Sequence, residues 1–556
     1  MFLLAAFLLL GSGWGGASLA LAQQGREPSF GVAAVVSDKA PRWPGIDVLH
    51  YEIAVELPET GREVVGRTEI LYEAVGDSLS KVRFDFAGMA VDSVAVDGVA
   101  APFRHAGGEL VVETPGTAPG ARSEATVWYH GVPQHGLVVR RSKDGSLAAF
   151  ADNWPDRARW WFPGIDHPSD KATVAFEVSA PAGVEVVANG IRTGERKTAD
   201  GRRWTRWAMS SEIPTYGMVI GATDFATTRA GEVDGVAVEH WTLAADSAAG
   251  EAAFARSVEI LGLYDSLFGP HPYEKLAHVQ LGTRFGAMEN PSAIFYPRAA
   301  ITRTPPGGSD GTTALVAHET VHQWFGNAVT EKDWNHLWLS EGFASYLAAV
   351  FFEFRGSASG RGTEELARRM RRMAEEVFAF QRRAPDAAVV DPGLGPGEYE
   401  KLLTPLVYEK GAWVLHMLRR RVGDEAFFDA LRDYYATLRD GTAWTADFER
   451  IVEEASGMEL GWFFAQWLAR PGHPVLAVET APLGKGGKTW TVGLRQVQEG
   501  EPFRFAVDLK LVWTGGSRVE RVEVDSRESR WRFEVPAPLE RVEVDPGGWL
   551  LHQRTR

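Results

Sequence analysis

One stretch of the 556-residue chain constrains its fold and chemistry most: Val316-Ala317-His318-Glu319-Thr320-Val321-His322-Gln323-Trp324-Phe325-Gly326. Apolar residues flank this stretch, and Gly326 is well placed to end a helix. Residues four apart on a helix stand one turn above the other, so His318 and His322 can present two imidazoles to one metal ion. Glu319, one position round the helix, can reach a water molecule bound to that ion. The stretch therefore predicts a metal-binding helix.

A third metal ligand is expected from the next helix. A catalytic zinc ion takes three protein ligands and keeps one position open for water. Glu341 follows His322 by nineteen residues, and Ser340 before it is placed to cap a helix. A carboxylate among aromatic neighbours is costly to bury unless a cation or hydrogen bonds satisfy it, which favours a ligand role. We expect one zinc ion per chain; the alternative is a surface helix with two satisfied histidines and a glutamate.

Composition restricts the chemistry and the partners. The chain has no cysteine, which excludes disulfides, thiol nucleophiles, iron–sulfur clusters and thiolate zinc sites. A metal must therefore be held by histidine and carboxylate. Lys and Arg number 58 against 73 Asp and Glu, and the resulting net charge of −15 disfavours nucleic acid or an anionic membrane as a partner.

The N-terminus predicts export. Residues 2–10 are almost entirely Phe, Leu and Ala, and Ala20-Leu21-Ala22 before Gln23 forms a cleavage site of the Ala-x-Ala type. The apolar run is too short for a membrane-spanning helix, which needs about 20 residues. We expect residues 1–22 to be a signal peptide and the mature chain, without an integral membrane span, to be periplasmic or extracellular. A buried N-terminal helix or an uncleaved anchor is the alternative.

Hydrophobic periodicity predicts a multidomain α+β fold with three regions after the signal. Residues 45–243 contain period-2 runs such as Tyr51, Ile53 and Val55, and we expect a β domain there. Residues 244–472 are mainly helical in pattern and contain the metal stretch. Residues 473–556 return to period 2 and predict a small β-sandwich. The arginine-rich segment 361–383 carries interleaved glutamates, which favours a solvated helix face over an anion-binding patch.

Further motifs lie in order along the chain: Asp166 to Ala172, Gly286-Ala287-Met288-Glu289-Asn290, Tyr408-Glu409-Lys410-Gly411, and Phe463 to Leu468 followed by Pro471-Gly472-His473-Pro474. With the HExxH-x18-E pattern they resemble the zinc aminopeptidases related to aminopeptidase N and leukotriene hydrolase, from about residue 45 to near the end. The resemblance implies a saddle-like N-terminal β-sheet domain, a thermolysin-like zinc domain and a C-terminal β-sandwich.

The resemblance also implies roles for the zinc site. His318, His322 and Glu341 are implied to bind zinc. Glu319 would take a proton from the metal-bound water and later pass it to the leaving amine. Tyr408, a neutral donor at pH 7, would donate a hydrogen bond to the developing oxyanion.

The motif from Gly286 to Asn290, which contains Ala287 and Met288, is implied to bind substrate. A carboxylate at Glu289 can pair with the free α-ammonium of a peptide and fix its first peptide bond over the metal. The backbone of Gly286 and Ala287 would hold the extended peptide as an added strand. These residues imply an exopeptidase acting on peptides with a free N-terminus.

Three features depart from the family pattern. The usual Gln or Glu five residues before Arg159, which helps to hold the amine, is Trp154 here, so Asp152 or Asn153 takes over or the amine is held differently. His336 occupies a position where relatives commonly carry Asp. The sequence also ends without the large helical C-terminal domain of many relatives, from which we expect a more open cleft and no basic residue supplied by that domain.

The leading hypothesis is an exported zinc aminopeptidase. One alternative is a zinc endopeptidase in which Glu289 binds no amine. Another is a non-catalytic exported β-rich binding protein with a vestigial zinc site. The presence of all three ligands, the base and the tyrosine argues against decay. Oligomeric state and first-residue preference have no signature in the sequence.

Overall fold

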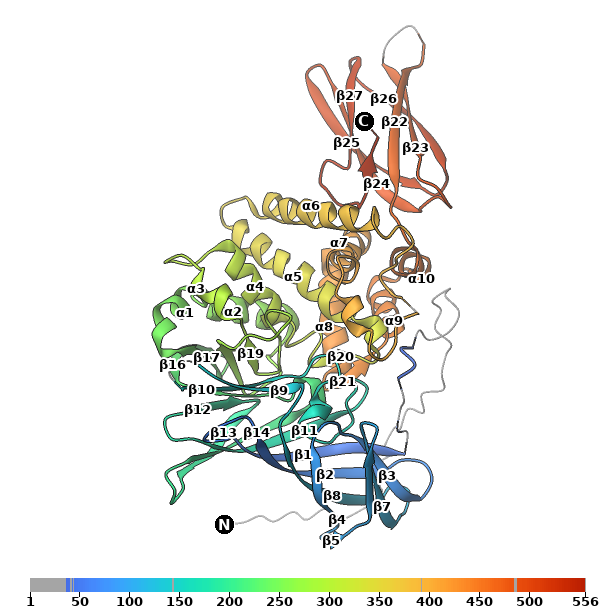
Figure 1. Cartoon of the computed structure of the whole chain (residues 1–556). Helices are drawn as coiled ribbons and strands as arrows, with labels where there is room; N and C mark the ends of the chain where they lie inside the picture. Colours follow the sequence, from blue (N-terminus) through green and yellow to red (C-terminus); the bar gives the residue numbers. More distant parts are fainter. Residues whose placement is uncertain are drawn as a thin grey trace, which may run out of the picture.

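The structure is a computed structural model that describes residues 37–40, 43, 45–142, 145–391, 393–484 and 488–555. Three parts follow one another along the chain: a β-rich N-terminal part, a mainly helical middle part and a small β part at the far end of the molecule (Figure 1). This arrangement confirms the predicted fold class. The predicted signal peptide, residues 1–22, lies outside the described residues.

The N-terminal part is built on an eight-stranded sheet of order β13-β14-β11-β1-β2-β8-β4-β5. Strand β1 runs parallel to β11, and the other pairs are antiparallel. Tyr51, Ile53 and Val55 are buried on one face of β1, as their period-2 spacing predicts. Smaller sheets have the orders β12-β15-β10-β9 and β3-β7-β6. The strands are β1 (Ile46–Glu56), β2 (Val64–Ala74), β3 (Leu79–Asp85), β4 (Ala90–Val96), β5 (Val99–Ala100), β6 (Phe103–Ala106), β7 (Glu109–Thr117), β8 (Arg122–Gly131), β9 (Gly136–Arg141), β10 (Leu147–Asp152), β11 (Lys171–Ala180), β12 (Glu185–Ala188), β13 (Ile191–Lys197), β14 (Arg203–Pro214) and β15 (Ile220–Thr223).

A four-stranded sheet links the N-terminal part to the helical part. Its order is β16 (Phe225–Val233), β17 (Val236–Leu243), β18 (Lys275–Val279) and β19 (Ala293–Phe295). Strands β17 and β18 are parallel neighbours, so hydrogen bonds of one sheet run across the boundary that we expected at 243/244. The domain boundaries themselves stay predictions.

The helical part is centred on α5 (Trp338–Ser357), which packs against α4 (Asp310–Val321), α6 (Gly362–Gln381) and α7 (Gly411–Val422). Residues 338–352 of α5 are all buried, because this helix is apolar around most of its circumference. Helix α5 begins two residues before Ser340, so the predicted cap is wrong. Helix α4 ends at Val321, five residues before Gly326. The other elements are α1 (Ser247–Ala253), α2 (Ser257–Phe268), α3 (Arg298–Thr302), β20 (Val329–Glu331), α8 (Asp424–Leu438), β21 (Gly441–Ala443), α9 (Thr445–Ser456) and α10 (Gly461–Phe464).

The C-terminal part has two sheets, β26-β23-β22-β28 and β25-β24-β27. Leu509 and Leu511 on β24 and Val492 and Leu494 on β23 are buried between them. Trp549 stacks on His416 of α7 with ring centroids 4.3 Å apart, which joins this part to the helices. The strands are β22 (Val475–Pro482), β23 (Thr489–Gln496), β24 (Phe505–Trp513), β25 (Gly516–Val524), β26 (Glu528–Glu534), β27 (Leu539–Val544) and β28 (Gln553–Arg554).

Candidate active site

Helices α4 and α5 bring the three predicted metal ligands together. The Nε2 atoms of His318 and His322 lie 3.2 Å apart. Oε2 of Glu341 lies 3.2 Å from Nε2 of His318 and 3.4 Å from Nε2 of His322. Zinc bonds of about 2.0–2.2 Å in a tetrahedral site require ligand atoms roughly 3.3–3.6 Å apart. The triangle formed by these three atoms therefore fits a single zinc ion.

The second nitrogen of His322 fixes the tautomer that a metal requires. Nδ1 of His322 lies 3.1 Å from the carbonyl oxygen of Phe325 and 3.0 Å from Oγ of Ser340. Because a carbonyl oxygen only accepts, Nδ1 carries the proton and Nε2 keeps its lone pair for a metal. Ser340 thus orients a ligand instead of capping its helix.

Three buried glutamates surround the two imidazoles. Glu289, Glu319 and Glu341 are all buried. Burial raises the pKa of Glu289 and raises that of Glu319 still further. Burial also opposes ionisation of Glu341, but the adjoining His322 and His318 hold its pKa well below the usual range. Three buried carboxylates in one site are costly without a cation, so the electrostatics of the site also fit a bound metal.

Tyr408 lies beside the ligand triangle. It belongs to a π-helical turn, residues 406–410, that leads into α7. Its hydroxyl donates a hydrogen bond of 2.9 Å to Oε1 of Glu341, and its ring lies nearly parallel to that of His318 at 6.2 Å. Burial raises the pKa of Tyr408 well above its usual value, so the hydroxyl stays a neutral donor.

The segment from Gly286 to Asn290 is held by two amides of the turn that follows α4. Nε2 of Gln323 and Nδ2 of Asn327 each donate a 2.7 Å hydrogen bond to the carbonyl oxygen of Glu289. Met288 exchanges two backbone hydrogen bonds of 2.8 Å with Phe295 of β19, which keeps the segment extended. We did not predict these roles for Gln323 and Asn327, although both lie within five residues of His322.

Asp152 and Asn153, the residues expected to bind the substrate amine in place of the usual Gln or Glu, are hydrogen-bonded to other groups. Asp152 accepts hydrogen bonds of 2.9 and 3.1 Å from the guanidinium of Arg157. Asn153 donates to a backbone carbonyl at 2.7 Å and accepts from an indole at 2.9 Å. Trp154 lines the cavity instead, with its ring edge-to-face against Phe285 at 5.1 Å. Neither Asp152 nor Asn153 lines the cavity.

The predicted site residues share one cavity of about 660 Å³. Of the predicted set, the cavity lining includes Gly286, Ala287, Met288, Glu289, His318, Glu319, His322, Glu341 and Tyr408. Asn290 is buried beside it. His336 does not line the cavity: its Nδ1 lies 2.8 Å from Oγ1 of Thr445, and its ring packs on Trp444.

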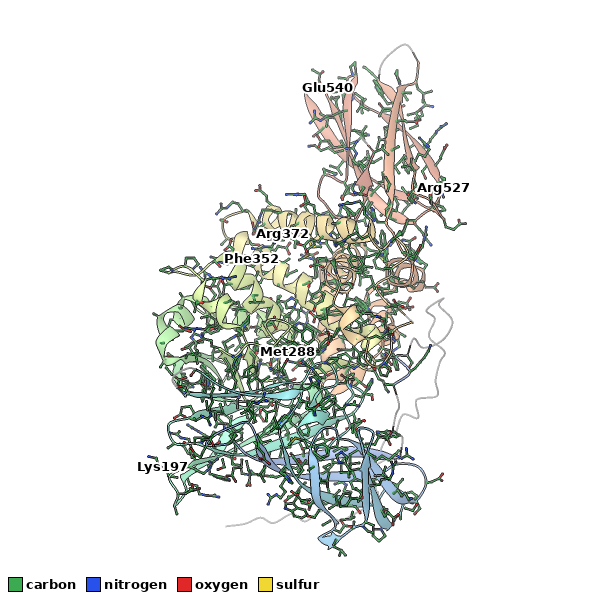
Figure 2. All side chains as sticks on the ribbon, in the orientation of Figure 1. Lys197, Met288, Phe352, Arg372, Arg527 and Glu540 are labelled. Carbon is green, nitrogen blue, oxygen red and sulfur yellow. The ribbon has the colours of Figure 1, made fainter. Side chains whose placement is uncertain are left out.

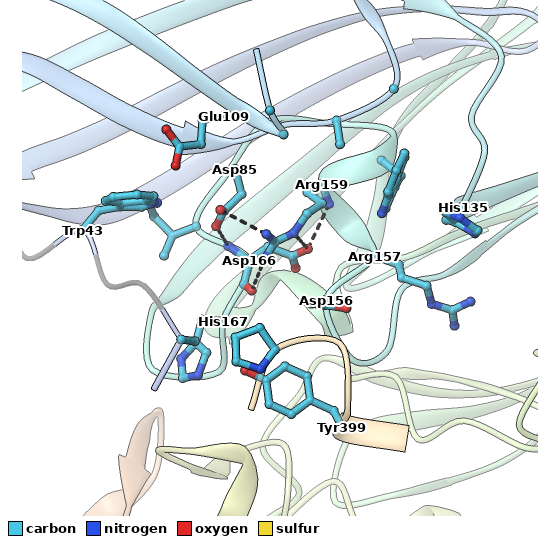
Figure 3. A pocket seen from close by; sticks show the side chains of 18 of the residues that line it. Trp43, Asp85, Glu109, His135, Asp156, Arg157, Arg159, Asp166, His167 and Tyr399 are labelled. Atoms are coloured by element: carbon cyan, nitrogen blue, oxygen red, sulfur yellow. Dashed lines mark hydrogen bonds and ion pairs between the residues drawn. The ribbon is translucent and has the colours of Figure 1, made fainter. Parts of the chain in front are cut away.

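A second cavity, of about 810 Å³, lies between the N-terminal part and the short 3-10 turn that begins at Tyr399 (Figure 3). Arg159 is its central cation and pairs with Asp85 at 3.2 Å and with Asp166 at 3.0 Å. Arg284, from the segment between β18 and β19, pairs with Glu400. Two arginines of this junction cavity, Arg159 and Arg284, are therefore already paired with carboxylates of its lining, and Glu109 and Asp156 add further carboxyl groups.

Comparison with known proteins places these features in a family. The Peptidase M1 N-terminal domain matches residues 48–216, and the Peptidase family M1 domain matches residues 252–467. A probable aminopeptidase 2 of Sulfurisphaera tokodaii is 26% identical over 72% of this chain and 51% of its own length. A glutamyl aminopeptidase of Sus scrofa is 27% identical over 65% of this chain and 41% of its own length. The chain spans about half the length of such relatives.

A solved structure shares the fold. A mutant of an M1 zinc metallopeptidase from Deinococcus radiodurans superposes with a TM-score of 0.66 at 25% identity, over 79% of this chain and 99% of that protein. In the part of the chain that the structure describes, we find no helix with the length and apolarity needed to span a bilayer.

Proposed function

Because this chain belongs to peptidase family M1, we propose that it is a zinc-dependent aminopeptidase that removes the first residue of peptides. The observation that carries the proposal is the convergence of five side chains on one cavity: the ligand triangle, Glu319 and Tyr408. The names of its relatives and the match to an M1 zinc metallopeptidase structure support it.

His318, His322 and Glu341 hold the metal, one ion per chain. When bound, zinc acts as a Lewis acid and lowers the pKa of a coordinated water molecule. The hydrogen bond from Nδ1 of His322 to the carbonyl of Phe325 keeps that ring in its ligating orientation. Removing either histidine leaves too few protein ligands for a catalytic site.

Glu319 is the general base. Its carboxylate lines the cavity one helix position from His318 and is ready to accept a proton from the attacking water. The same carboxyl then passes the proton to the leaving amine. Burial raises the pKa of the Glu319 carboxyl, which makes its carboxylate a stronger base than an exposed one.

Tyr408 and Glu289 position the substrate. The Tyr408 hydroxyl, now 2.9 Å from a carboxylate oxygen of Glu341, is available to donate to the oxyanion that develops on the scissile carbonyl. The Glu289 carboxylate pairs with the α-ammonium of the peptide, which aligns the first peptide bond with the metal ligands. Because Trp154 occupies the position where relatives carry a second amine-binding Gln or Glu, Glu289 is the main group that binds the amine.

A panel of aminoacyl chromogenic amides, assayed with and without a chelator, tests metal dependence and first-residue preference together. We expect turnover that is lost with the chelator and restored by zinc, together with one zinc per chain by elemental analysis. Absence of turnover by the zinc-loaded protein would contradict the proposal and favour a binding protein.

Comparison of a free with an N-acetylated peptide separates the exopeptidase from the endopeptidase. Acetylation removes the ammonium that Glu289 binds, so cleavage should be lost. Equal cleavage of the two peptides would favour the endopeptidase.

Export is part of the proposal. The apolar run and the Ala-x-Ala site of residues 1–22 support removal of a signal peptide and a periplasmic or extracellular mature protein. N-terminal sequencing of the protein from its native cells should then begin at Gln23. A sequence beginning at Met1 in the cytosolic fraction contradicts it.

A further inference from the structure

Helix α6 contributes a side chain to the cavity that holds the candidate zinc site. Arg372 and Met373, from the middle of this arginine-rich helix, line that cavity. Figure 2 labels Arg372 on α6 and Met288 of the cleft below it. The predicted solvated face therefore holds for part of the helix, while one arginine of the segment faces the cleft.

Arg372 is the one Lys or Arg among the described residues that line this cavity. The same lining carries four carboxylates, those of Glu289, Glu319, Glu341 and Glu409. Glu319 and Glu341 serve proton transfer and the metal in the proposed function, and Glu289 serves the amine. The cation at Arg372 has no part in that scheme.

The guanidinium of Arg372 is available for a ligand. Its one ion pair among the described residues, with Glu376, is long at 3.7 Å from Nε to Oε1 and is not a hydrogen bond, and the Arg372 side chain is 80% exposed. Arg368 and Arg369 of the same helix both pair instead with Glu365.

A neighbouring carboxyl does not prevent an anion from binding. Glu409 lies in the same lining, and burial together with Glu376 raises its pKa to about 8. Glu409 is therefore mostly protonated at neutral pH and repels an incoming carboxylate only weakly. Glu376 is 48% exposed, so solvent screens its charge.

A short peptide at neutral pH carries an ammonium at one end and a carboxylate at the other. The cavity offers a carboxylate at Glu289 and a guanidinium at Arg372, with the candidate metal ligands in the same lining. Guanidinium and carboxylate groups can form two parallel hydrogen bonds, which fix direction as well as charge. We propose that Arg372 binds the C-terminal carboxylate of short peptides, and that free short peptides are therefore the preferred substrates. This proposal rests on the proposed aminopeptidase function.

Kinetics with a tripeptide and its C-terminal amide test the proposal. Exposed ion pairs contribute up to about 1 kcal/mol, so kcat/KM for the acid should exceed that for the amide by roughly three- to fivefold, mainly through KM. In Arg372→Gln this ratio should fall to about one. Arg371→Gln, one position earlier on the same helix and outside the cavity lining, is the matched control and should keep the ratio.

Binding measurements keep the test independent of turnover. In calorimetry, zinc-loaded Glu319→Gln should bind the acid more tightly than the amide. The Glu319→Gln, Arg372→Gln double variant should bind the two peptides with equal affinity. An acid-to-amide ratio near one in the unmodified protein, or a ratio that persists in Arg372→Gln, overturns the role of Arg372 and leaves the aminopeptidase function intact. Failure of the aminopeptidase function itself shows instead as no hydrolysis of either peptide, while calorimetry still decides whether Arg372 selects the acid.

Discussion

The two large cavities of this protein differ in how their charges are balanced. In the junction cavity Arg159 lies between Asp85 and Asp166, and Arg284 pairs with Glu400. In the zinc-site cavity four carboxyl groups face two imidazoles and a single guanidinium. The cavities are similar in volume, about 810 and 660 Å³, so size does not separate them.

This difference shows which cavity is built for a ligand. Buried charges that pair with one another hold parts of a protein together and leave little for a ligand to satisfy. Buried carboxylates without a cation raise the free energy of the folded protein until a metal or an ammonium group binds. The arginines of the junction cavity are therefore already occupied by carboxylates of the same part of the chain, whereas the zinc-site cavity leaves most of its carboxyl groups without a basic partner.

The largest expected effect comes from Glu319→Gln. Glutamine keeps the shape of the side chain but cannot accept the proton, so kcat should fall at least about 10³-fold. Zinc content should stay at one per chain, because the three ligands are intact. Stopped assays with a chromogenic amide and elemental analysis check both points, and residual activity above a tenth of the original contradicts the role of Glu319.

Glu289→Gln should have the next largest effect. Hydrogen bonds to charged groups contribute about 1.5–3 kcal/mol, so kcat/KM for free peptides should fall roughly 10- to 100-fold. The measurement is kcat/KM for a free peptide in the variant and in the unmodified protein. If Glu289→Gln leaves that value unchanged, Glu289 is not the amine anchor.

The junction cavity should respond in stability and not in catalysis. Asp166 is almost fully buried and accepts a hydrogen bond from Thr215 besides its pairing with Arg159. Asp166→Asn removes the charge, which should cost about 2 kcal/mol of folding free energy and lower the melting temperature. Activity per folded molecule should be retained. A selective loss of activity would show that this cavity belongs to the active site.

The smallest effect concerns Glu331, a buried carboxyl behind the zinc-site cavity. Its carboxylate oxygens have no hydrogen-bond partner among the described residues, and burial raises its pKa well above 4.5. Between its unfolded and folded pKa values the unfolded chain has lost this proton while the folded protein keeps it. Stability therefore falls as the pH rises through this window.

Glu331→Gln removes that dependence. The difference in unfolding free energy between the variant and the unmodified protein should grow by about 1 kcal/mol per pH unit within the window, in favour of the variant. Melting curves of zinc-loaded protein from pH 5 to 8 give this difference. A difference that is independent of pH contradicts an unpartnered carboxyl.

Local spacing explains what the sequence could predict. The four-residue step from His318 to His322 places two imidazoles on one helix face whatever surrounds the helix. The alternation of Tyr51, Ile53 and Val55 likewise identifies a buried strand. These inferences needed only helix and strand geometry.

Long-range partners explain what it could not predict. Ser340 looked like a helix cap, but its hydroxyl lies against His322, and α5 begins earlier. Asp152 was a candidate amine holder until the fold placed Arg157 beside it. In both cases a polar side chain makes a contact in the folded chain with a residue that its sequence neighbours do not reveal.

The two amides that hold the Glu289 carbonyl also bear on inhibitor design. Gln323 and Asn327 tie the segment from Gly286 to Asn290 to the stretch that carries His322, so the backbone of Glu289, the proposed amine anchor, is held at a fixed distance from that stretch. An inhibitor that joins an amine to a metal-binding group through a stiff spacer of matching length needs no rearrangement of the protein. Its affinity should then depend mainly on the rigidity of the spacer, because a rigid spacer loses little conformational entropy on binding.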